Sequence, residues 1–321
     1  MRATLQKIIN YAVKAPSGHN TQPWKFRAEG CSLYIYPDYT RSLQKVDGDH
    51  HELFISLGCA LENAVVAANA FGYKETVSYH FNGDQDYIRV SLEPTERTKD
   101  LNLFLAIDER QVTRSVYNKQ NIPATQLVDM VIAARERDVF LNIYDTEEEI
   151  AGLVPFVEEA AVLQYGDKDF RRELAEWVRF NDEEAAEQKD GLRSRLLQAP
   201  EVPTWMGKLY MNHFVSAEGE AKKARELVES SSALVLFTAL NNNKEGWVNL
   251  GRCYERMALM ATALGIRHAH VNMPCEERAV REKLKRSLGY VTEEPLLLIR
   301  LGYAEAAPRS YRRRLEEVME A

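Results

Sequence analysis

Residues 15–24, with the sequence APSGHNTQPW, hold the densest group of side chains that could bind a small molecule. Asn20 and Gln22 each offer a paired hydrogen-bond donor and acceptor, and Ser17 adds a hydroxyl group. Gly18 lacks a side chain, so a flat ring could lie against bare backbone there. These residue types suit a flat heteroaromatic molecule that is held at its edge, although an ordinary polar loop has the same composition.

Two groups of arginines could bind a phosphate. Arg110 and Arg114 are four residues apart, a spacing that places two side chains on one face of a helix. Arg312 and Arg313 form the second group. Two separated arginine groups can bind one dianionic phosphate through forked donors. The alternative interpretation is a solvated surface on which each arginine pairs with a nearby Glu.

Two further clusters are weaker candidates. His268, His270 and Cys275 are metal-ligand types, but a fourth ligand at a useful spacing is missing, so we expect no metal site. The His-His-Glu run at 50–52 precedes a predicted helix, which favours a solvated capping role over catalysis.

The elements that must position these residues are helices and strands in alternation. The pattern predicts a helix over residues 5–14, before the loop, and a strand over 33–36, after it. Residues 57–70 are apolar on most sides and rich in small residues, with Ser56 as the predicted N-cap and Gly72 as the C-cap. Such a helix belongs in the core, where two backbones can approach closely.

A second segment repeats this central helix. Residues 57–73 align without gaps on residues 250–266. The identical positions include Gly58 with Gly251 and Glu62 with Glu255. In both halves a strand ending in Asp precedes the helix and further strands follow it. A chance match of two helices rich in Gly and Ala is the alternative, but the matching order of the flanking elements favours an internal duplication.

We therefore predict an α+β fold of two fused, pseudo-symmetric halves, residues 1–105 and 106–321, packed through the two helices. The second half carries a helical insertion at 147–228 that is dense in charge. A breaker-rich span within it contains Trp205 and Met206, which makes the insertion a candidate lid over a site. The alternative is that the insertion only enlarges the fold.

The composition excludes several classes of function. The chain has 321 residues, a formal net charge of -7 and a pI of about 5.7, whereas a sequence-independent nucleic-acid binder should be basic. The first residues lack the apolar region of a signal peptide, and no apolar run approaches the ~20 residues of a membrane span. The four cysteines form no CxxC pair. We therefore expect a cytoplasmic protein with free thiols and without nucleic-acid or membrane partners.

Together, these motifs resemble those of the nitroreductase superfamily of FMN-dependent oxidoreductases. The resemblance is specifically to the long, internally fused subgroup that includes the mycobacterial dormancy-associated members, and it runs over nearly the whole chain. The matching pieces are the segments 15–24, 110–114, 251–265 and 300–304, the pair Arg312 and Arg313, and the insertion segments 170–177 and 190–192.

Ordinary members of this family are homodimers with two FMN molecules at the subunit interface. Each FMN takes arginines from one subunit and a ring-contact loop from the other. In this chain the first half has the loop but lacks the arginine pattern, and the second half has the arginines but not the loop residues at 135–140. The resemblance therefore implies one FMN per chain, bridging the halves, in a monomer that looks like a dimer.

The resemblance also assigns roles by position. Arg110 and Arg114, helped by Arg312 or Arg313, would bind the FMN phosphate. The other cofactor-binding residues would contact the flavin ring: Pro16, Ser17, Asn20, Gln22, His270, Val271 and Asn272. Residues 270–272 would place a backbone N–H opposite flavin N5, where charge develops on reduction. One departure is Val112, which stands where the family has a hydroxyl residue.

The activity implied by the resemblance is two-electron reduction of a flat acceptor, such as a nitroaromatic compound or a quinone, with NAD(P)H as the expected donor. No side chain is assigned as catalytic, because the flavin carries the hydride chemistry. The alternative is an FMN-binding or sequestering protein without NAD(P)H turnover, if the insertion closes over the ring through Trp205 and Met206. Loss of FMN altogether is a third alternative, which predicts colourless protein.

Overall fold

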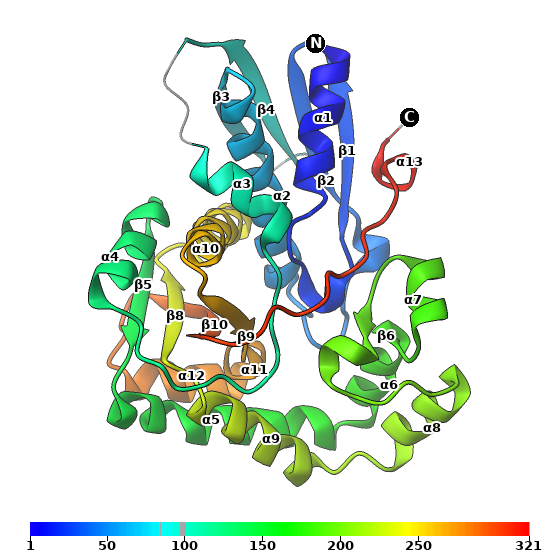
Figure 1. Cartoon of the computed structure of the whole chain (residues 1–321), viewed down its shortest axis with the longest axis vertical. Helices are drawn as coiled ribbons and strands as arrows, with labels where there is room; N and C mark the ends of the chain where they lie inside the picture. The colour runs from blue at the N-terminus through cyan, green and yellow to red at the C-terminus, as the bar shows by residue number, and fades with distance from the viewer. Residues whose placement is uncertain (82, 84, 97–100, 321) are drawn as a thin grey trace.

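The computed structural model describes residues 1–81, 83, 85–96 and 101–320, which form an α+β fold with two antiparallel four-stranded sheets (Figure 1). The first sheet has the order β1-β2-β4-β3, with β1 (Trp24–Glu29), β2 (Ser32–Pro37), β3 (Tyr73–His80) and β4 (Tyr87–Pro94). The second has the order β5-β8-β10-β9, with β5 (Val139–Tyr144), β8 (Ala233–Ala239), β9 (Arg267–His270) and β10 (Glu294–Gly302). The predicted α+β class is confirmed.

Two 20-residue helices, α2 (His51–Ala70) and α10 (Lys244–Ala263), cross in the core. They meet at the two aligned glycines. A Cβ on Gly58 would lie 2.1 Å from the Val248 carbonyl oxygen, and one on Gly251 would lie 2.0 Å from the Ile55 carbonyl oxygen. Only glycine permits this direct backbone contact. Helix α2 has the length and hydropathy of a membrane span, but 89% of that window is buried inside the protein, as in a core helix.

The start of α2 corrects a sequence prediction. The helix begins at His51, so Ser56 lies within its second turn and donates to the Glu52 carbonyl oxygen instead of capping. Asp47 performs the capping, because its carboxylate accepts the N–H groups of Glu52 and Leu53 at 2.9 and 2.8 Å. His51 is buried, so the predicted solvated role of this run is wrong.

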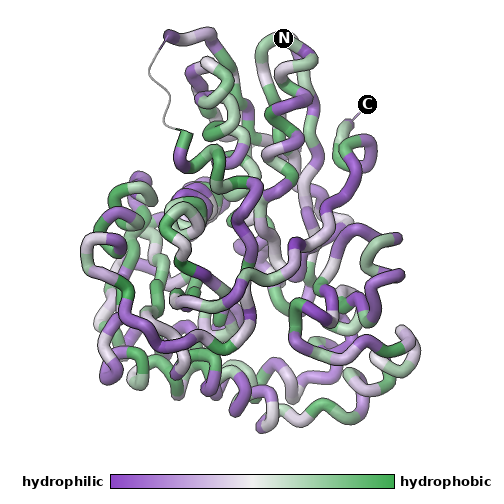
Figure 2. Tube along the Cα trace, in the orientation of Figure 1, coloured by the Kyte–Doolittle hydropathy of each residue, from purple (hydrophilic) through white to green (hydrophobic). Residues whose placement is uncertain are grey.

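Three shorter helices pack around the central pair: α1 (Arg2–Ala12) against α2 and β1, α3 (Asn102–Glu109) against α10 and α2, and α4 (Ala124–Ala133) against α10. The segment from 147 to 229 is helical, with α5 (Glu147–Gly166), α6 (Lys168–Trp177), α7 (Asp182–Gln188), α8 (Thr204–His213) and α9 (Ala217–Glu229). Between them, β6 (Val178–Arg179) and β7 (Leu192–Arg193) pair in parallel. Hydrophilic and hydrophobic residues alternate along α5 and α9 (Figure 2), as expected of helices with one buried face.

The C-terminal segment crosses from the second sheet to the first. After α11 (Met273–Glu276), α12 (Arg278–Ser287) and β10, the chain runs past the loop after α1 and ends in α13 (Leu315–Val318) beside β1 (Figure 1). A parallel bridge between Phe26 and Met319 fixes this end. We call residues 304–314 the C-terminal arm.

Candidate functional site

The loop after α1 has a strained backbone. It contains the short 3-10 turn η1 (Gly18–Asn20), and His19, Asn20 and Gln22 have positive φ angles of 45°, 54° and 53°. Such conformations are uncommon for residues with a side chain and persist where surrounding bonds determine them. One of these bonds joins the Gln22 N–H to Ser17 Oγ at 2.9 Å.

Asn20 holds the loop to two distant segments. Its Nδ2 donates to the Gly191 carbonyl oxygen at 3.1 Å and to the Tyr311 carbonyl oxygen at 3.3 Å. Its Oδ1 accepts from Arg312 Nη1 at 3.0 Å. The side chain therefore connects the insertion and the C-terminal arm to the loop.

Gln22 has the same kind of role. Its Oε1 accepts the Arg313 N–H at 2.7 Å, and its Nε2 donates to the Lys189 carbonyl oxygen at 2.9 Å. Arg313 Nη1 in turn donates to the Gln22 carbonyl oxygen at 3.1 Å. Because the side-chain amides of Asn20 and Gln22 are both occupied, a contact with a ring edge would have to replace these bonds. Their ring-contact role stays a prediction.

The structure brings the loop and both arginine groups together. Arg110 Nη2 and Arg312 Nη2 donate to the same Lys14 carbonyl oxygen, at 2.9 and 3.1 Å. The two arginines do not share a helix face as their spacing allowed, because α3 ends at Glu109. The chain then runs extended and pairs with β9 through a bridge between Val112 and His268.

Glu255 is the carboxylate nearest to Arg110, at 3.2 Å between its Oε1 and Arg110 Nε. The geometry is not that of a hydrogen bond, and both Glu255 oxygens lack a hydrogen-bond partner among the described residues. Burial raises the pKa of Glu255 to about 7, against the opposing effect of Arg110 and Arg312. The alignment of the two central helices identified Glu255 as a repeated position. Nothing in the sequence indicated that its side chain lies near the arginines.

Arg114 makes no hydrogen bond or ion pair with any residue in the described part of the chain. Burial, and then the Arg300 charge, lower its pKa. Arg114 also acts on the loop, because burial and the Arg114 charge together lower the pKa of His19 to about 4. Arg114 is therefore an unpaired cation close to the loop.

The segment after β9 lies in the same positive field. Burial, followed by the charges of Arg114 and Arg110, lowers the pKa of His270 to about 3, so this histidine is neutral. The Val271 N–H already donates to the Leu298 carbonyl oxygen at 3.0 Å, and Asn272 Oδ1 accepts the Leu298 N–H at 2.8 Å. That residues 270–272 place a backbone N–H opposite flavin N5 stays a prediction. The Val271 N–H already has an acceptor, the Leu298 carbonyl oxygen.

The two lid candidates lie on α8 and are exposed, Trp205 by 68% and Met206 by 44%. The insertion reaches the loop through Lys189 and Gly191 instead. These two contacts were missed in the sequence because they use backbone carbonyls, which any residue type offers.

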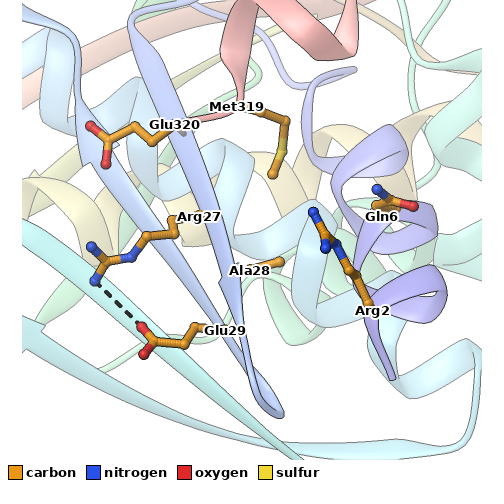
Figure 3. A pocket seen from close by; sticks show the side chains of 7 residues that line it. All are labelled: Arg2, Gln6, Arg27, Ala28, Glu29, Met319 and Glu320. Carbon is orange, nitrogen blue, oxygen red and sulfur yellow. Dashed lines mark ion pairs between the residues drawn. The ribbon is translucent and has the colours of Figure 1, made fainter.

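Two surface hollows lie apart from the predicted residues. One of about 220 Å³, between α1, β1 and the chain end (Figure 3), is lined by Arg2, Gln6, Arg27, Ala28, Glu29, Met319 and Glu320. Its Arg27 is paired with Glu29 at 3.7 Å. The other, of about 730 Å³, is lined by residues 115–118 and 303–305. Neither combines unpaired charge with the loop, so the candidate site is the arginine group beside residues 15–24.

Comparison with known proteins gives distant relatives of similar length. No family model matches the chain. It is 24% identical to the "Putative NAD(P)H nitroreductase Rv3131" of Mycobacterium tuberculosis, over 99% of this chain and 91% of that protein. It is 23% identical to the "Putative NAD(P)H nitroreductase acg" of the same organism, over 98% of this chain and 94% of that protein.

Among solved structures, the chain is similar to the FMN-dependent nitroreductase NfnB from Mycobacterium smegmatis, which was solved in complex with NADPH. The match covers 69% of this chain and 99% of that chain, at 15% identity. The TM-score of 0.43 is too low for the superposition to assign roles. The relationship rests on the sequence matches. Over nearly its whole length the chain is similar to the mycobacterial proteins described as NAD(P)H nitroreductases, which is the resemblance that its motifs predicted.

Proposed function

We propose that this protein is an FMN-dependent oxidoreductase of the nitroreductase type. The observation that carries the proposal is the unbalanced positive charge beside the loop. Arg110 and Arg312 share a carbonyl oxygen, Arg114 has no partner in the described chain, and Glu255 is the one carboxylate in ion-pair contact with them there. Burial and the Arg110 charge lower the pKa of Arg312 to about 9. A dianionic phosphate would supply the missing negative charge.

The chain's own residues would do the binding and the positioning. Arg110, Arg114 and Arg312 would hold the phosphate, and the backbone of the loop near Ser17 and Gly18 would lie against the ring. Bound FMN would supply the hydride chemistry, with NAD(P)H as donor and a flat nitroaromatic or quinone acceptor. The cysteines of the described chain are free thiols, as a reducing cytoplasm would leave them.

One site per chain follows if the two halves, 1–105 and 106–321, are fused copies of one unit. The meeting of Gly58 with Gly251 at the helix crossing supports a pseudo-two-fold axis there. The loop then comes from the first half and the arginines from the second, and a monomer suffices. The insertion at 147–228 would act as a lid, attached to the first half through the hydrogen bond from Arg41 to Asp190.

The test is a titration of FMN-free protein with FMN, followed by calorimetry and by absorbance. We expect saturation at one FMN per chain and rapid bleaching of the bound flavin when NADH or NADPH is added in a stopped-flow instrument. Saturation at two per chain would contradict the single site. Absence of binding would contradict the proposed function as a whole.

A second candidate, an FMN-sequestering protein, is favoured by one specific observation. Both the insertion and the C-terminal arm are hydrogen-bonded to the loop through Asn20 and Gln22, which closes the loop from two sides. A closed site would bind FMN but exclude the nicotinamide. One bound FMN without bleaching by NADH or NADPH would identify this function.

A further inference from the structure

Two carboxylic acids lie together beside the candidate site. Glu52 is in the first turn of α2 and Glu276 is in α11, and the two side chains are hydrogen-bonded to each other. Glu52 Oε1 accepts from Asn272 Nδ2, and Glu276 Oε2 accepts from Gln164 Nε2 at 2.6 Å. Both carboxyl groups are half-buried. The pair therefore joins three helices, α2, α5 and α11, the last of which has Asn272 as its N-cap.

The pair contacts both segments that are predicted to meet the flavin ring. A Cβ on Gly18 would lie 3.2 Å from Glu52 Oε2, so the loop backbone is against the carboxyl group. The Gly18 N–H points to Ser56 Oγ at 3.4 Å, one turn further along α2. On the other side, Asn272 follows β9 and donates to Glu52. Glu52 thus bridges the loop and the segment at 270–272.

The surroundings of the pair favour one retained proton. Burial, and then the charges of Glu276 and Asp47, raise the pKa of Glu52 well above its ordinary value, while the His51 charge opposes them. Burial also raises the pKa of Glu276, against the hydrogen bonds from Gln164 and Glu52 and the His51 charge. Glu277 is a further carboxyl nearby, and its pKa is raised by burial and by Glu276.

Two carboxylates in hydrogen-bond contact cannot both ionise without a large electrostatic cost, so one keeps its proton and donates it to the other. Glu52 is the member of the pair that faces the loop, because a Cβ on Gly18 would lie 3.2 Å from its Oε2, whereas Glu276 is bonded to Gln164. The two groups titrate as a unit.

We propose that Glu52 and Glu276 share one proton at neutral pH, and that Glu52 gives this proton to an acceptor reduced at the adjoining site. This proposal rests on the proposed function. A two-electron reduction of a nitro or quinone oxygen group consumes a hydride equivalent and a proton. FMN, held by the arginines and the loop, would supply the hydride equivalent, with NAD(P)H as the donor. The Glu52 O–H bond breaks, its proton goes to the acceptor oxygen, and the carboxylate left behind takes a proton from water.

The first test needs neither FMN nor turnover. Infrared spectra of the FMN-free protein at pH 7, in H₂O and in D₂O, should show the C=O band of a protonated carboxyl group that shifts on deuteration. All variants are made in protein that already carries Glu255→Gln, because Glu255, with a pKa raised to about 7, is also partly protonated at pH 7. In this background Glu52→Gln should remove the band, and Glu276→Gln should lower its pH midpoint because the neighbouring negative charge is gone. The matched control, Glu277→Gln, should retain it. A band that persists unchanged in Glu52→Gln would overturn the proposal.

The second test uses the FMN-loaded protein in single-turnover reactions. Glu52→Gln should slow reduction of a quinone by ~100-fold, the ordinary loss on removing a general acid. FMN stoichiometry and the rate of flavin bleaching by the nicotinamide should stay within twofold. Equal quinone rates in wild type and Glu52→Gln would refute the proton-donating role. If wild-type protein binds no FMN, the proposed function fails, whereas the infrared result still decides whether the proton is shared.

Discussion

Glu62 and Glu255 occupy aligned positions on the two central helices, yet their surroundings differ completely. Glu62 on α2 accepts from Arg252 Nε at 2.8 Å and lies 3.3 Å from Arg256 Nε, and Glu136 contacts the same two arginines. Two carboxylates thus neutralise two guanidinium groups. Among the described residues, Glu255 on α10 has one ion-pair contact, the misaligned one with Arg110, and it lies next to Arg114 and Arg312.

The difference shows that two aligned positions can have opposite charge balance. Arg256 Nη1 donates to the Arg135 carbonyl oxygen at 2.9 Å, so the paired network also holds the segment at 135–140, where the second half lacks the loop residues. A network in which the carboxylates balance the guanidinium groups offers no net positive charge to an anion. The Glu255 region keeps an excess of positive charge, which a phosphate would balance.

The largest expected effect is on stability, in the region of Glu62, where carboxylates and arginines are paired. Arg252→Ala should lower the free energy of unfolding by about 3 kcal/mol, because Glu62 is only 3% exposed and loses one of its two partners. Chemical denaturation measures this change. FMN binding should stay within twofold of wild type. A large loss of FMN affinity would mean that the paired region also binds cofactor, and the contrast between the regions would fail.

A smaller effect, on FMN binding, is expected in the region of Glu255, where positive charge is in excess. Arg114→Ala should weaken FMN binding by ~30-fold, about 2 kcal/mol, the ordinary value of a charged hydrogen bond. Stability without FMN should change little, because Arg114 has no bonded partner in the described chain to lose. Arg137→Ala, at an exposed surface position, is the control. Calorimetry and denaturation together separate the two effects, and unchanged FMN affinity would remove Arg114 from the site.

The smallest expected effect concerns pH. The pKa of Glu255 is raised to about 7 by burial, so the carboxyl is neutral below pH 7 and negative above it, where it opposes a phosphate. Glu255→Gln should therefore match wild type in FMN affinity near pH 5.5 and bind about tenfold more tightly at pH 8.

The comparison with Glu255→Gln is needed because the FMN phosphate itself gains charge above its second pKa of about 6. The raised pKa also means that the folded state binds more protons than the unfolded state between pH 4.5 and 7. This contribution to stability is present at low pH and is lost as the pH rises through 7. A constant affinity ratio between the two proteins from pH 5.5 to 8 would show that Glu255 does not face the phosphate.

The structural features that depend on a local sequence pattern could be predicted from the sequence. The glycine and alanine spacing of 57–70 and 250–263 correctly indicated two buried helices, because close packing at Gly58 and Gly251 leaves a compositional mark. Arg110 and Arg114 do not share a helix face, because pairing with β9 overrides the helical spacing. The partners of Asn20 and Gln22 are 167 to 292 residues away, so no local pattern could indicate them.

The hydrogen bond between Arg312 and the Lys14 carbonyl oxygen joins residues 298 positions apart. During translation, the loop at 15–24 would be synthesised early, whereas Arg312 would be added only after most of the chain. A nascent chain that lacks the arm could fold its first sheet and still be unable to retain a flavin. Cofactor capture in this molecule would thus follow synthesis of the arm, and colour would distinguish chains that carry the arm from chains that lack it.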